Sequence, residues 1–503
     1  MHQHYDVIII GSGMGGLVAG NLLALEGYKV CVLEKNKQIG GSLQIYARDR
    51  VIFDSGVHYL GGLDEGQNLY KIFKYLGIMD KLKLQKMDEV FDKIMIAGDD
   101  TVYEYAQGYD KFISHLLKFF PGEEMAINAY CDKMKDICAR FPLYNLLPSD
   151  PNDTKASLLG IDTKTFIESI TTNERLQQVL AGNNGLYAGE ADKTPLYVHA
   201  LIINSYIESS YKCIDGGGQI AKYIGRNIMK LGGDVVKHAH VKKIVEQGGV
   251  VTHVELADGR KVYGNHFISN MHPAVTIEMT ESNLFKKAYR NRLNNLENSV
   301  SSFTINVVFK KKAQKHFTYN YYVCNEGDVW SSADYTDENW PKSFALFIAL
   351  SSREKEYADG MTILAYMRYE DVKQWENTYN IVGEEEDRGK AYEEFKRIKA
   401  EKLIDSVEKR FPGFKDKIEK YYTASPLSYR DYIGNTDGAL YGVAKDYKDA
   451  LKTFISPRTK LPNLFLTGQN LNLHGILGAA MSSIVTVNAL TGNDNIIEKI
   501  RNV

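Results

Sequence analysis

The feature that most constrains this chain is a glycine-rich turn near its N-terminus. The β-rich run Tyr5–Ile10 leads into Gly-Ser-Gly-Met-Gly-Gly at residues 11–16, and apolar residues then repeat at helical spacing. Gly11 permits a tight turn, Gly13 lets the backbone approach a pyrophosphate, and Gly16 lets the helix pack close to the strand. The helix N-terminus presents N–H groups and a positive dipole to phosphates. The segment therefore predicts a dinucleotide-binding strand, turn and helix; a glycine-rich turn that binds nothing is the alternative.

The acidic residue that such a site requires follows in the sequence. A second strand is predicted at Lys29–Leu33, and Glu34 stands at its end. An acid about 20 residues after the first glycine of the turn accepts hydrogen bonds from the ribose of an adenosine. Glu34 stands close to that spacing from Gly11 and is therefore predicted to bind the ribose.

A glycine doublet indicates which dinucleotide is bound. Gly40-Gly41-Ser42 follows Glu34 and Lys35 within a few residues. NAD domains usually lack this doublet, and glycines here let the backbone pass close to the diphosphate and ribityl parts of FAD. We predict FAD as the cofactor, against the alternative of an ordinary loop that contains two glycines.

The C-terminal part of the chain repeats the order of strand, loop and helix. The apolar run Leu464–Leu466 leads into Thr467-Gly468-Gln469, and an apolar helix is predicted from Gly475 through Leu490. The N-terminus of this helix can place N–H groups beside the pyrimidine edge of a flavin. Packing in the core explains the segment equally well at this stage.

Between these segments the pattern changes several times. Amphipathic helices are predicted at 71–76, 110–120 and 222–230, and a surface helix at 391–411. Short strands at 241–246, 250–256 and 261–263 predict a β-meander. Gly216–Gly218 is not expected to follow a strand, so we predict one dinucleotide fingerprint and no separate NAD domain. The electron donor or acceptor therefore stays unidentified.

Composition narrows the classes of partner and compartment. Basic residues number 61 and acidic residues 63, with no basic face interleaved with aromatics, so no nucleic-acid partner is expected. Five scattered cysteines fit a reducing compartment. A strand that begins at Tyr5 leaves no room for a signal peptide, so the protein is expected to be cytoplasmic. No apolar run reaches the length of a membrane span. Peripheral membrane contact stays open.

Two further patterns are assigned no chemistry. His238 and His240 sit two apart on a predicted strand, but the sequence offers no further ligands, so no metal is predicted. The charge runs Lys310–Lys312 and Glu384–Asp387 are interpreted as solvated loops.

Several motifs together resemble a known family. They are Phe53–Gly61, Phe120–Glu124, Ser425–Leu427, Gly438–Gly442 and Leu464–Ala480. With the N-terminal fingerprint, they make the chain resemble, nearly end to end, the phytoene desaturase and carotenoid isomerase group of flavoproteins, most closely its retinol saturase branch. Two positions depart from that pattern. Ser42 stands where desaturases typically carry Arg, and His474-Gly475 replaces a glycine-cysteine pair.

The resemblance implies site residues. Val241 would reach the adenine through its backbone, Gly478 and Ala479 would lie under the isoalloxazine ring with Leu477 beside them, and His58 and Tyr59 would lie where flavin and substrate meet. The other FAD contacts would be Gly11, Gly13, Gly16, Glu34, Lys35, Gly40, Gly41, Ser42, Gly468 and Gln469. If the reaction is a reduction, a proton donor is needed, and His58, Tyr59 or His474 could serve.

The resemblance also implies fold and activity. We expect an α/β protein whose Rossmann-like FAD domain is assembled from residues 1–75, 205–290 and 425–503. Residues 76–204 and 291–424 would form a mixed α+β substrate lobe, as in the amine oxidase and phytoene desaturase scaffold. The expected reaction is hydride transfer between flavin N5 and an apolar polyene or isoprenoid, as saturase, desaturase or isomerase. An amine-oxidase-like flavoenzyme and a non-redox prenyl-binding or lipid-binding protein are the alternatives.

Overall fold

The computed structural model describes residues 4–148, 156–380, 388–493 and 495–503. The acidic run Glu384–Asp387 therefore lies outside the described residues. The basic run Lys310–Lys312 lies in the turn that follows a strand ending at Phe309, and Lys310 and Lys311 are exposed.

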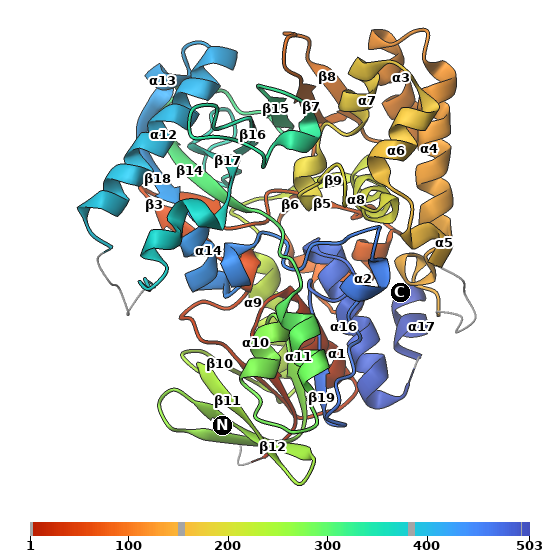
Figure 1. Cartoon of the computed structure of the whole chain (residues 1–503), viewed down its shortest axis with the longest axis vertical. Helices are drawn as coiled ribbons and strands as arrows, with labels where there is room; N and C mark the ends of the chain where they lie inside the picture. The colour runs from red at the N-terminus through yellow and green to blue at the C-terminus, as the bar shows by residue number, and fades with distance from the viewer. Residues whose placement is uncertain (1–3, 149–155, 381–387, 494) are drawn as a thin grey trace.

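A seven-stranded sheet forms the half of the molecule at the bottom of Figure 1. Its parallel part has the order β10-β2-β1-β13, with β19 also paired to β13, and β12 and β11 continue from β13 as an antiparallel meander. The strands are β1 (Tyr5–Ile10), β2 (Val30–Leu33), β10 (Asp234–Val236), β11 (Val241–Gln247), β12 (Val250–Leu256), β13 (Lys261–Ser269) and β19 (Leu464–Leu466).

The strand β13 joins the meander to the parallel sheet. Its first residues pair with β12, and the stretch from Gly264 to Ser269 pairs with β1. The sequence predicted this strand to end at Tyr263, but it continues through Phe267 and Ile268, which are fully buried. The longer strand carries the chain from the meander into the core.

A second seven-stranded sheet lies at the top of Figure 1 and has the order β18-β14-β17-β16-β15-β7-β8. It is antiparallel except where β15 pairs with β7. Its strands are β7 (Val90–Met95), β8 (Tyr103–Ala106), β14 (Ser301–Phe309), β15 (Asn320–Cys324), β16 (Ser343–Ile348), β17 (Gly360–Met367) and β18 (Ile418–Ala424). Small sheets pair β3 (Ile45–Arg48) with β4 (Val51–Asp54), and β9 (Ser210–Cys213) with β5 (Leu60–Gly61) and β6 (Leu84–Lys86).

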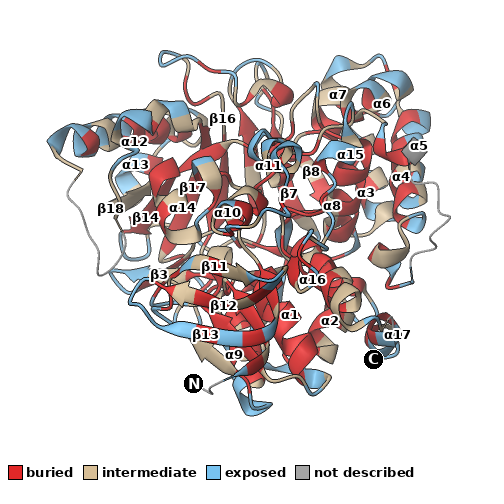
Figure 2. Ribbon diagram, turned by 60° about the horizontal axis from the view of Figure 1, so that its bottom comes forward, coloured by how far each residue is buried: buried red, intermediate tan, exposed pale blue. Residues whose placement is uncertain are grey.

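Helices cover the sheets, and two of them are almost wholly buried. Figure 2 shows α1 (Met14–Leu25) and α16 (Gly475–Thr491) largely in the buried colour, and the two pack against each other. The other helices are α2 (Asn68–Tyr75), α3 (Tyr109–Phe119), α4 (Glu124–Ala139), α5 (Ala156–Leu159), α6 (Thr163–Ile170), α7 (Glu174–Leu180), α8 (Leu196–Glu208), α9 (Gly218–Lys230), α10 (Pro273–Glu278), α11 (Lys287–Asn294), α12 (Lys390–Arg410), α13 (Phe414–Lys417), α14 (Pro426–Ile433), α15 (Ala450–Thr453) and α17 (Asn495–Arg501).

The predicted elements are largely confirmed. The N-terminal strand, turn and helix are β1, the loop and α1, and the predicted helices correspond to α2, α3, α9 and α12. The two large sheets draw their strands from different stretches of the chain, 5–33, 234–269 and 464–466 against 90–106 and 301–424. The domain boundaries themselves stay a prediction.

Two expectations were wrong. His238 and His240 lie in the loop between β10 and β11, where His238 has φ +52°, a left-handed conformation that ends a strand. Gly216–Gly218 does follow a strand, β9, and leads into α9. β9 belongs to an antiparallel sheet, and a Cβ on Gly216 would meet Ile45 at 2.8 Å, so these glycines pack against protein.

Three general properties concern the described residues only. None of their helices is long and apolar enough to cross a membrane. They contain no group of three or more His, Cys, Asp or Glu side chains placed to hold a metal. The five cysteines are buried and free.

Candidate functional site

One large cavity begins at the carboxyl ends of β1 and β2 and reaches the second sheet. Ile10 and Leu33 line one end of it, and Tyr322 and Phe347 line the other. Of the site residues proposed from sequence, the cavity wall includes Gly11, Gly13, Glu34, Lys35, Gly40, Gly41, Ser42, His58, Tyr59, Val241, Gln469 and Ala479. Gly16, Gly468, Leu477, Gly478 and His474 lie outside that wall.

Glycines bring two loops into contact at the first end. Gly13 and Gly40 form a parallel bridge, and a Cβ on Gly41 would lie 3.1 Å from the Cα atom of Gly13. Gly40 has φ +121° and Gly41 φ +57°, conformations that favour glycine. Gly16 allows the helix to pack closely against the turn, because a Cβ there would lie 2.1 Å from the carbonyl oxygen of Gly11. The result is a cleft walled by backbone, as binding of a pyrophosphate requires.

Glu34 is held rigidly at the edge of this cleft. Its Oε2 atom accepts hydrogen bonds from the Ser12 hydroxyl at 2.5 Å and the Ser12 N–H at 3.2 Å. Its Oε1 atom accepts from the Asn36 N–H at 2.8 Å. The side chain is 5% exposed, and Oε1, which accepts one hydrogen bond, keeps a lone pair for a ligand. This arrangement suits a carboxylate that accepts from a ribose hydroxyl.

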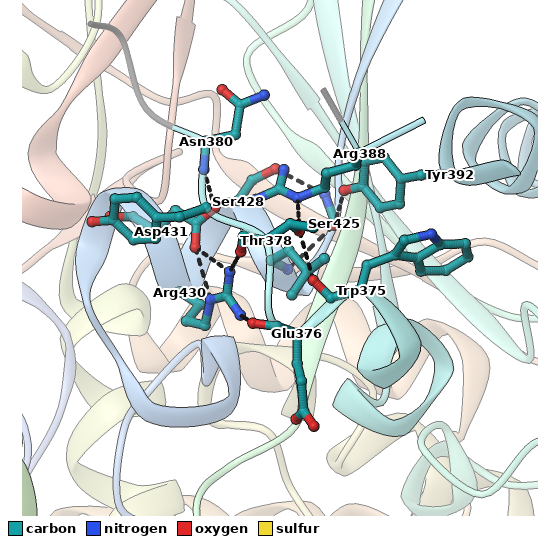
Figure 3. A network of polar contacts seen from close by, with 12 residues as sticks. Trp375, Glu376, Thr378, Asn380, Arg388, Tyr392, Ser425, Ser428, Arg430 and Asp431 are labelled. Carbon is teal, nitrogen blue, oxygen red and sulfur yellow. Dashed lines mark hydrogen bonds and ion pairs between the residues drawn. The ribbon is translucent and has the colours of Figure 1, made fainter. Parts of the chain in front are cut away.

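Lys35 is held by α14. Its Nζ atom donates to the carbonyl oxygen of Asp431 at 2.7 Å, and burial lowers its pKa. Figure 3 shows the buried Asp431 carboxylate with Arg388 and Arg430, which donates its Nε–H at 2.7 Å. This network fixes α14, which contributes Tyr429 and other residues to the cavity wall. The Lys35 side chain therefore links the loop after β2 to α14, and it also lines the cavity.

The start of α16 lies against the cavity. Gly475, Ile476 and Ala479 line it, and a Cβ on Gly478 would lie 2.5 Å from the carbonyl oxygen of Leu473. Gly478 thus permits the close turn into the helix. The helix has no side-chain cap, so its first N–H groups are available to a ligand.

His474 is turned away from the main cavity. Its ring packs on Tyr441 with centroids 4.6 Å apart and faces a separate small cavity near Lys445. Burial, with a smaller contribution from the charge of Lys445, lowers the pKa of His474 to about 3. A neutral imidazole outside the cavity wall is poorly placed to give a proton to a substrate in the cavity.

His58 lies where the cleft opens into an aromatic chamber. Its ring stacks on Phe347 with centroids 4.3 Å apart and an interplanar angle of 8°. Burial, with a smaller contribution from the charge of Lys212, lowers the pKa of His58 to about 3. His58 is therefore neutral at pH 7 and suited to stacking and hydrogen bonding rather than to acid catalysis. It also lines a second, more polar cavity of about 960 Å³.

Tyr59 lines the same chamber, and its hydroxyl group forms hydrogen bonds with two other side chains. Its hydroxyl lies 2.9 Å from Asp92 Oδ2 and 2.8 Å from the hydroxyl of Tyr322. The chamber is otherwise mainly aromatic and aliphatic, and Tyr206, Phe344, Phe347, Leu364, Tyr366 and Tyr441 contribute to its wall. Glu34 and Lys35 are the only Asp, Glu, Lys or Arg side chains among the described residues that line the cavity.

Comparison with known proteins identifies relatives along the whole chain. Residues 9–76 match the model described as an NAD(P)-binding Rossmann-like domain. The all-trans-retinol 13,14-reductase of Rattus norvegicus is 27% identical over 97% of this chain and 86% of its own. The prolycopene isomerase 1 of an Oncidium hybrid cultivar is 24% identical over 99% of this chain and 85% of its own.

The resemblance to the phytoene desaturase and carotenoid isomerase group is confirmed.

Solved structures agree on the fold of this chain. An oxidoreductase from Methanosarcina mazei superposes with a TM-score of 0.66 at 16% identity, covering 95% of this chain and 99% of its own. Putrescine oxidase superposes with 0.64 at 14%, covering 97% and 99%. A Rab GDI from Plasmodium falciparum superposes with 0.54 at 14%, covering 98% and 99%. The Rossmann-like α/β class and the amine oxidase scaffold are thus confirmed. Together with the retinol reductase and prolycopene isomerase relatives, this scaffold supports an oxidoreductase of the flavin type.

The structure adds residues of the cavity region that the sequence did not reveal. Asn270, directly after β13, packs into the glycine turn, because a Cβ on Gly13 would lie 2.8 Å from its Nδ2 atom and one on Gly468 would lie 2.3 Å from its Oδ1 atom. Tyr322 lines the chamber, and Asp92 lies behind it. No local motif marks these residues. The only signal was the end of β13, since ligands bind at the carboxyl ends of parallel strands.

Proposed function

We propose that the chain is an FAD-dependent oxidoreductase that transfers a hydride between the flavin and a carbon–carbon bond of a long apolar conjugated substrate, of the retinoid or carotenoid kind. The observation that carries the proposal is the continuity of one cavity. A cleft walled by glycine backbone and bounded by Glu34 opens directly into an aromatic chamber with no charged side chain among its described residues.

The residues of the cleft fit FAD. Gly11, Gly13, Gly40 and Gly41 would face its diphosphate, with α1 directing its N-terminus at the phosphates. Glu34 would hold the adenosine ribose. The start of α16, with Ala479, would lie at the isoalloxazine ring. When bound, FAD supplies an N5 atom that accepts or gives a hydride.

The chamber fits an apolar polyene better than a charged substrate. Burial of a charged ammonium group without a partner is unfavourable, and the described residues offer no carboxylate on the chamber wall. The names of the relatives agree with this inference, since one acts on retinol and the other on prolycopene. Aromatic rings exclude water and position a flat conjugated chain against the flavin.

Reoxidation of the reduced enzyme tests this proposal. The purified protein is reduced anaerobically with dithionite, freed of excess reductant and mixed with all-trans-retinol, with a carotenoid or with putrescine, while flavin absorbance is followed. We expect a polyene to restore the oxidised spectrum and to gain two hydrogens by mass spectrometry. A separate sample of the oxidised protein is mixed with putrescine. Reduction of its flavin by putrescine, together with no response of the reduced protein to polyenes, would instead support an amine oxidase.

A further inference from the structure

A fully buried acid lies behind the aromatic wall of the chamber. Asp92, on β7, has no exposed surface and is not part of the cavity wall. Its Oδ1 atom accepts from Asn320 Nδ2 at 2.9 Å, and its Oδ2 atom accepts from Asn183 Nδ2 at 3.1 Å. Burial of a carboxyl group is costly unless hydrogen bonds compensate for lost water. An apolar residue at position 92 would avoid that cost. The presence of an acid there therefore suggests a functional role.

Two tyrosine hydroxyls connect this acid to the chamber. The Tyr59 hydroxyl lies 2.9 Å from Asp92 Oδ2, and the Tyr322 hydroxyl lies 2.8 Å from that of Tyr59. Both tyrosines line the chamber, and Asp92 does not. A phenol hydroxyl both accepts and donates a hydrogen bond. Asp92, Tyr59 and Tyr322 therefore form a continuous hydrogen-bonded chain from the protein core to the cavity.

The surroundings of this hydrogen-bonded chain leave it little contact with water. The rings of Tyr206 and Phe347 have centroids 4.4 and 6.2 Å from that of Tyr59. Tyr59 is 5% exposed and Tyr322 is 6% exposed. In such a place, protons move along the fixed hydrogen bonds rather than through solvent.

The acid titrates close to neutral pH. Burial raises the pKa of Asp92 to about 6, although its hydrogen bonds and the charge of Lys212 oppose that rise. Lys212 is 2% exposed, and burial lowers its pKa to about 7. The other titratable groups that interact with Asp92 are Tyr59, Tyr105, Tyr206 and Tyr322. Asp92 can thus hold or release a proton near physiological pH, as a catalytic proton store must.

We propose that Asp92, Tyr59 and Tyr322 form the proton-delivery chain of this oxidoreductase, with Tyr322 as the group that meets the substrate. This inference rests on the function proposed above. In the direction of reduction, one carbon of the double bond would receive the hydride that a bound reduced flavin supplies. The other carbon takes the hydroxyl proton of Tyr322, the π bond is lost, and two C–H bonds form.

The chain then restores itself. Tyr59 passes its proton to Tyr322, Asp92 passes its proton to Tyr59, and Asp92 is left as a carboxylate. It regains a proton between turnovers along the same two tyrosine hydroxyls, from water that enters the chamber when the product leaves. In the direction of desaturation, the same chain accepts the proton that leaves the substrate. The balance in either direction needs only the flavin as the redox partner.

The first test measures the protonation of Asp92 in the absence of a substrate. Infrared difference spectra of the purified protein are recorded as pH is raised through 6, and the C=O band of a protonated buried carboxyl is followed. Asp54 provides the control, because it is another carboxyl group whose pKa burial raises, to about 7. We expect a band that disappears with a midpoint near pH 6 in the wild type and in Asp54→Asn, and that is missing in Asp92→Asn. An unchanged set of carboxyl bands in Asp92→Asn would overturn the proposal.

The second test measures delivery. Reduced holoenzyme is mixed with a polyene that reoxidises the wild type, and the single-turnover rate is recorded against pH. We expect Tyr322→Phe to slow this step by about a hundredfold or more, with flavin content unchanged. The wild-type rate should fall as pH rises through about 6, and Asp92→Asn should lose this dependence.

The control for loss of a buried tyrosine hydroxyl is Tyr130→Phe. Tyr130 is fully buried, bonds to His199 at 2.7 Å and does not line the cavity, so its variant should keep the wild-type rate. If Asp92→Asn does not fold, Tyr322→Phe decides, because it leaves Asp92 and Tyr59 in place. A Tyr322→Phe rate close to that of the wild type would refute the chain. Failure of every polyene to reoxidise the wild type would refute the proposed function itself.

Discussion

Glu34 meets the cleft with both carboxylate oxygens already fixed by the backbone and hydroxyl groups around it. We expect Glu34→Gln to weaken FAD binding about 10- to 100-fold, because an amide replaces a charge-assisted acceptor worth roughly 1.5–3 kcal/mol. Fluorescence titration of the apoprotein with FAD measures the effect. Glu65→Gln, at an exposed position outside the cavity wall, should bind FAD normally. Equal affinity of the two variants would remove Glu34 from the ribose site.

Gly13 tests the backbone wall of the cleft. Its φ of −63° is open to any residue, so Gly13→Ala should fold, but the new Cβ would lie 2.8 Å from Asn270 Nδ2. We expect about a tenfold loss of flavin affinity, or about 1.4 kcal/mol, measured as the flavin to protein ratio after dialysis. Gly122→Ala is the matched control, since a Cβ there meets nothing within 4 Å. Full flavin content in Gly13→Ala would argue against this wall as the phosphate site.

Asp92 also predicts a dependence of stability on pH. Its pKa rises from 3.8 to about 6 on folding, so the folded state binds more protons between these values, and wild-type stability falls as pH rises through them. The free energy of unfolding of the wild type relative to Asp92→Asn should therefore fall by up to about 3 kcal/mol between about pH 4 and pH 7. Urea unfolding at several pH values measures this difference. A constant difference would show that Asp92 is ionised throughout.

Single residues show the limits of inference from sequence. The glycines and Glu34 were predictable because a local motif carries them. His58 and Tyr59 line the chamber, and the low pKa of His58 depends on burial among residues distant in the chain. Asp92 and Tyr322 come from opposite halves of the sequence, and the pairing of β7 with β15 brings them together. No spacing in the sequence encodes that proximity.

At the scale of elements, periodicity predicted helices and strands well and loops poorly. α9, α12 and the meander lie where apolar spacing placed them. The alternation of residue types from Lys237 to His240 favours a strand. His238 has a left-handed backbone conformation, however, and β10 ends at Val236, before it reaches this residue. Likewise β9 precedes Gly216, because pairing with β5 and β6 stabilises a strand that carries a weak local signal.

The first turn of α16 has no room for an added Cβ atom at Gly478. Gly478→Ala would place a Cβ 2.5 Å from the carbonyl oxygen of Leu473. We expect a loss of about 1–3 kcal/mol in the free energy of unfolding and a lower flavin content, because the helix start must shift.

Ser482→Ala, one turn further along α16, is the control for that prediction. The Ser482 hydroxyl is buried with no hydrogen-bond partner in the described structure, so its removal should cost nothing or stabilise the protein. Thermal unfolding and the flavin spectrum of both variants measure the contrast. Equal behaviour of the two would show that the helix start tolerates a side chain.

At the scale of the whole molecule, the resemblance implied a Rossmann-like domain assembled from three stretches of the chain and a separate substrate lobe. β1, β2, β13 and β19 come from three stretches of the chain and meet in one sheet. The order of the second sheet could not be predicted. Its parallel pair joins β7 to β15, strands that lie far apart in the sequence. Alternation of apolar residues carries no information on which strands pair.

The visible absorption spectrum of the freshly purified protein, with release and chromatographic identification of any chromophore, tests the central claim most directly. We predict an oxidised flavin spectrum that bleaches on anaerobic addition of dithionite, with one FAD released per chain on denaturation. A colourless protein that binds no FAD when it is supplied would contradict the account and favour a binding protein on the same scaffold, without redox chemistry.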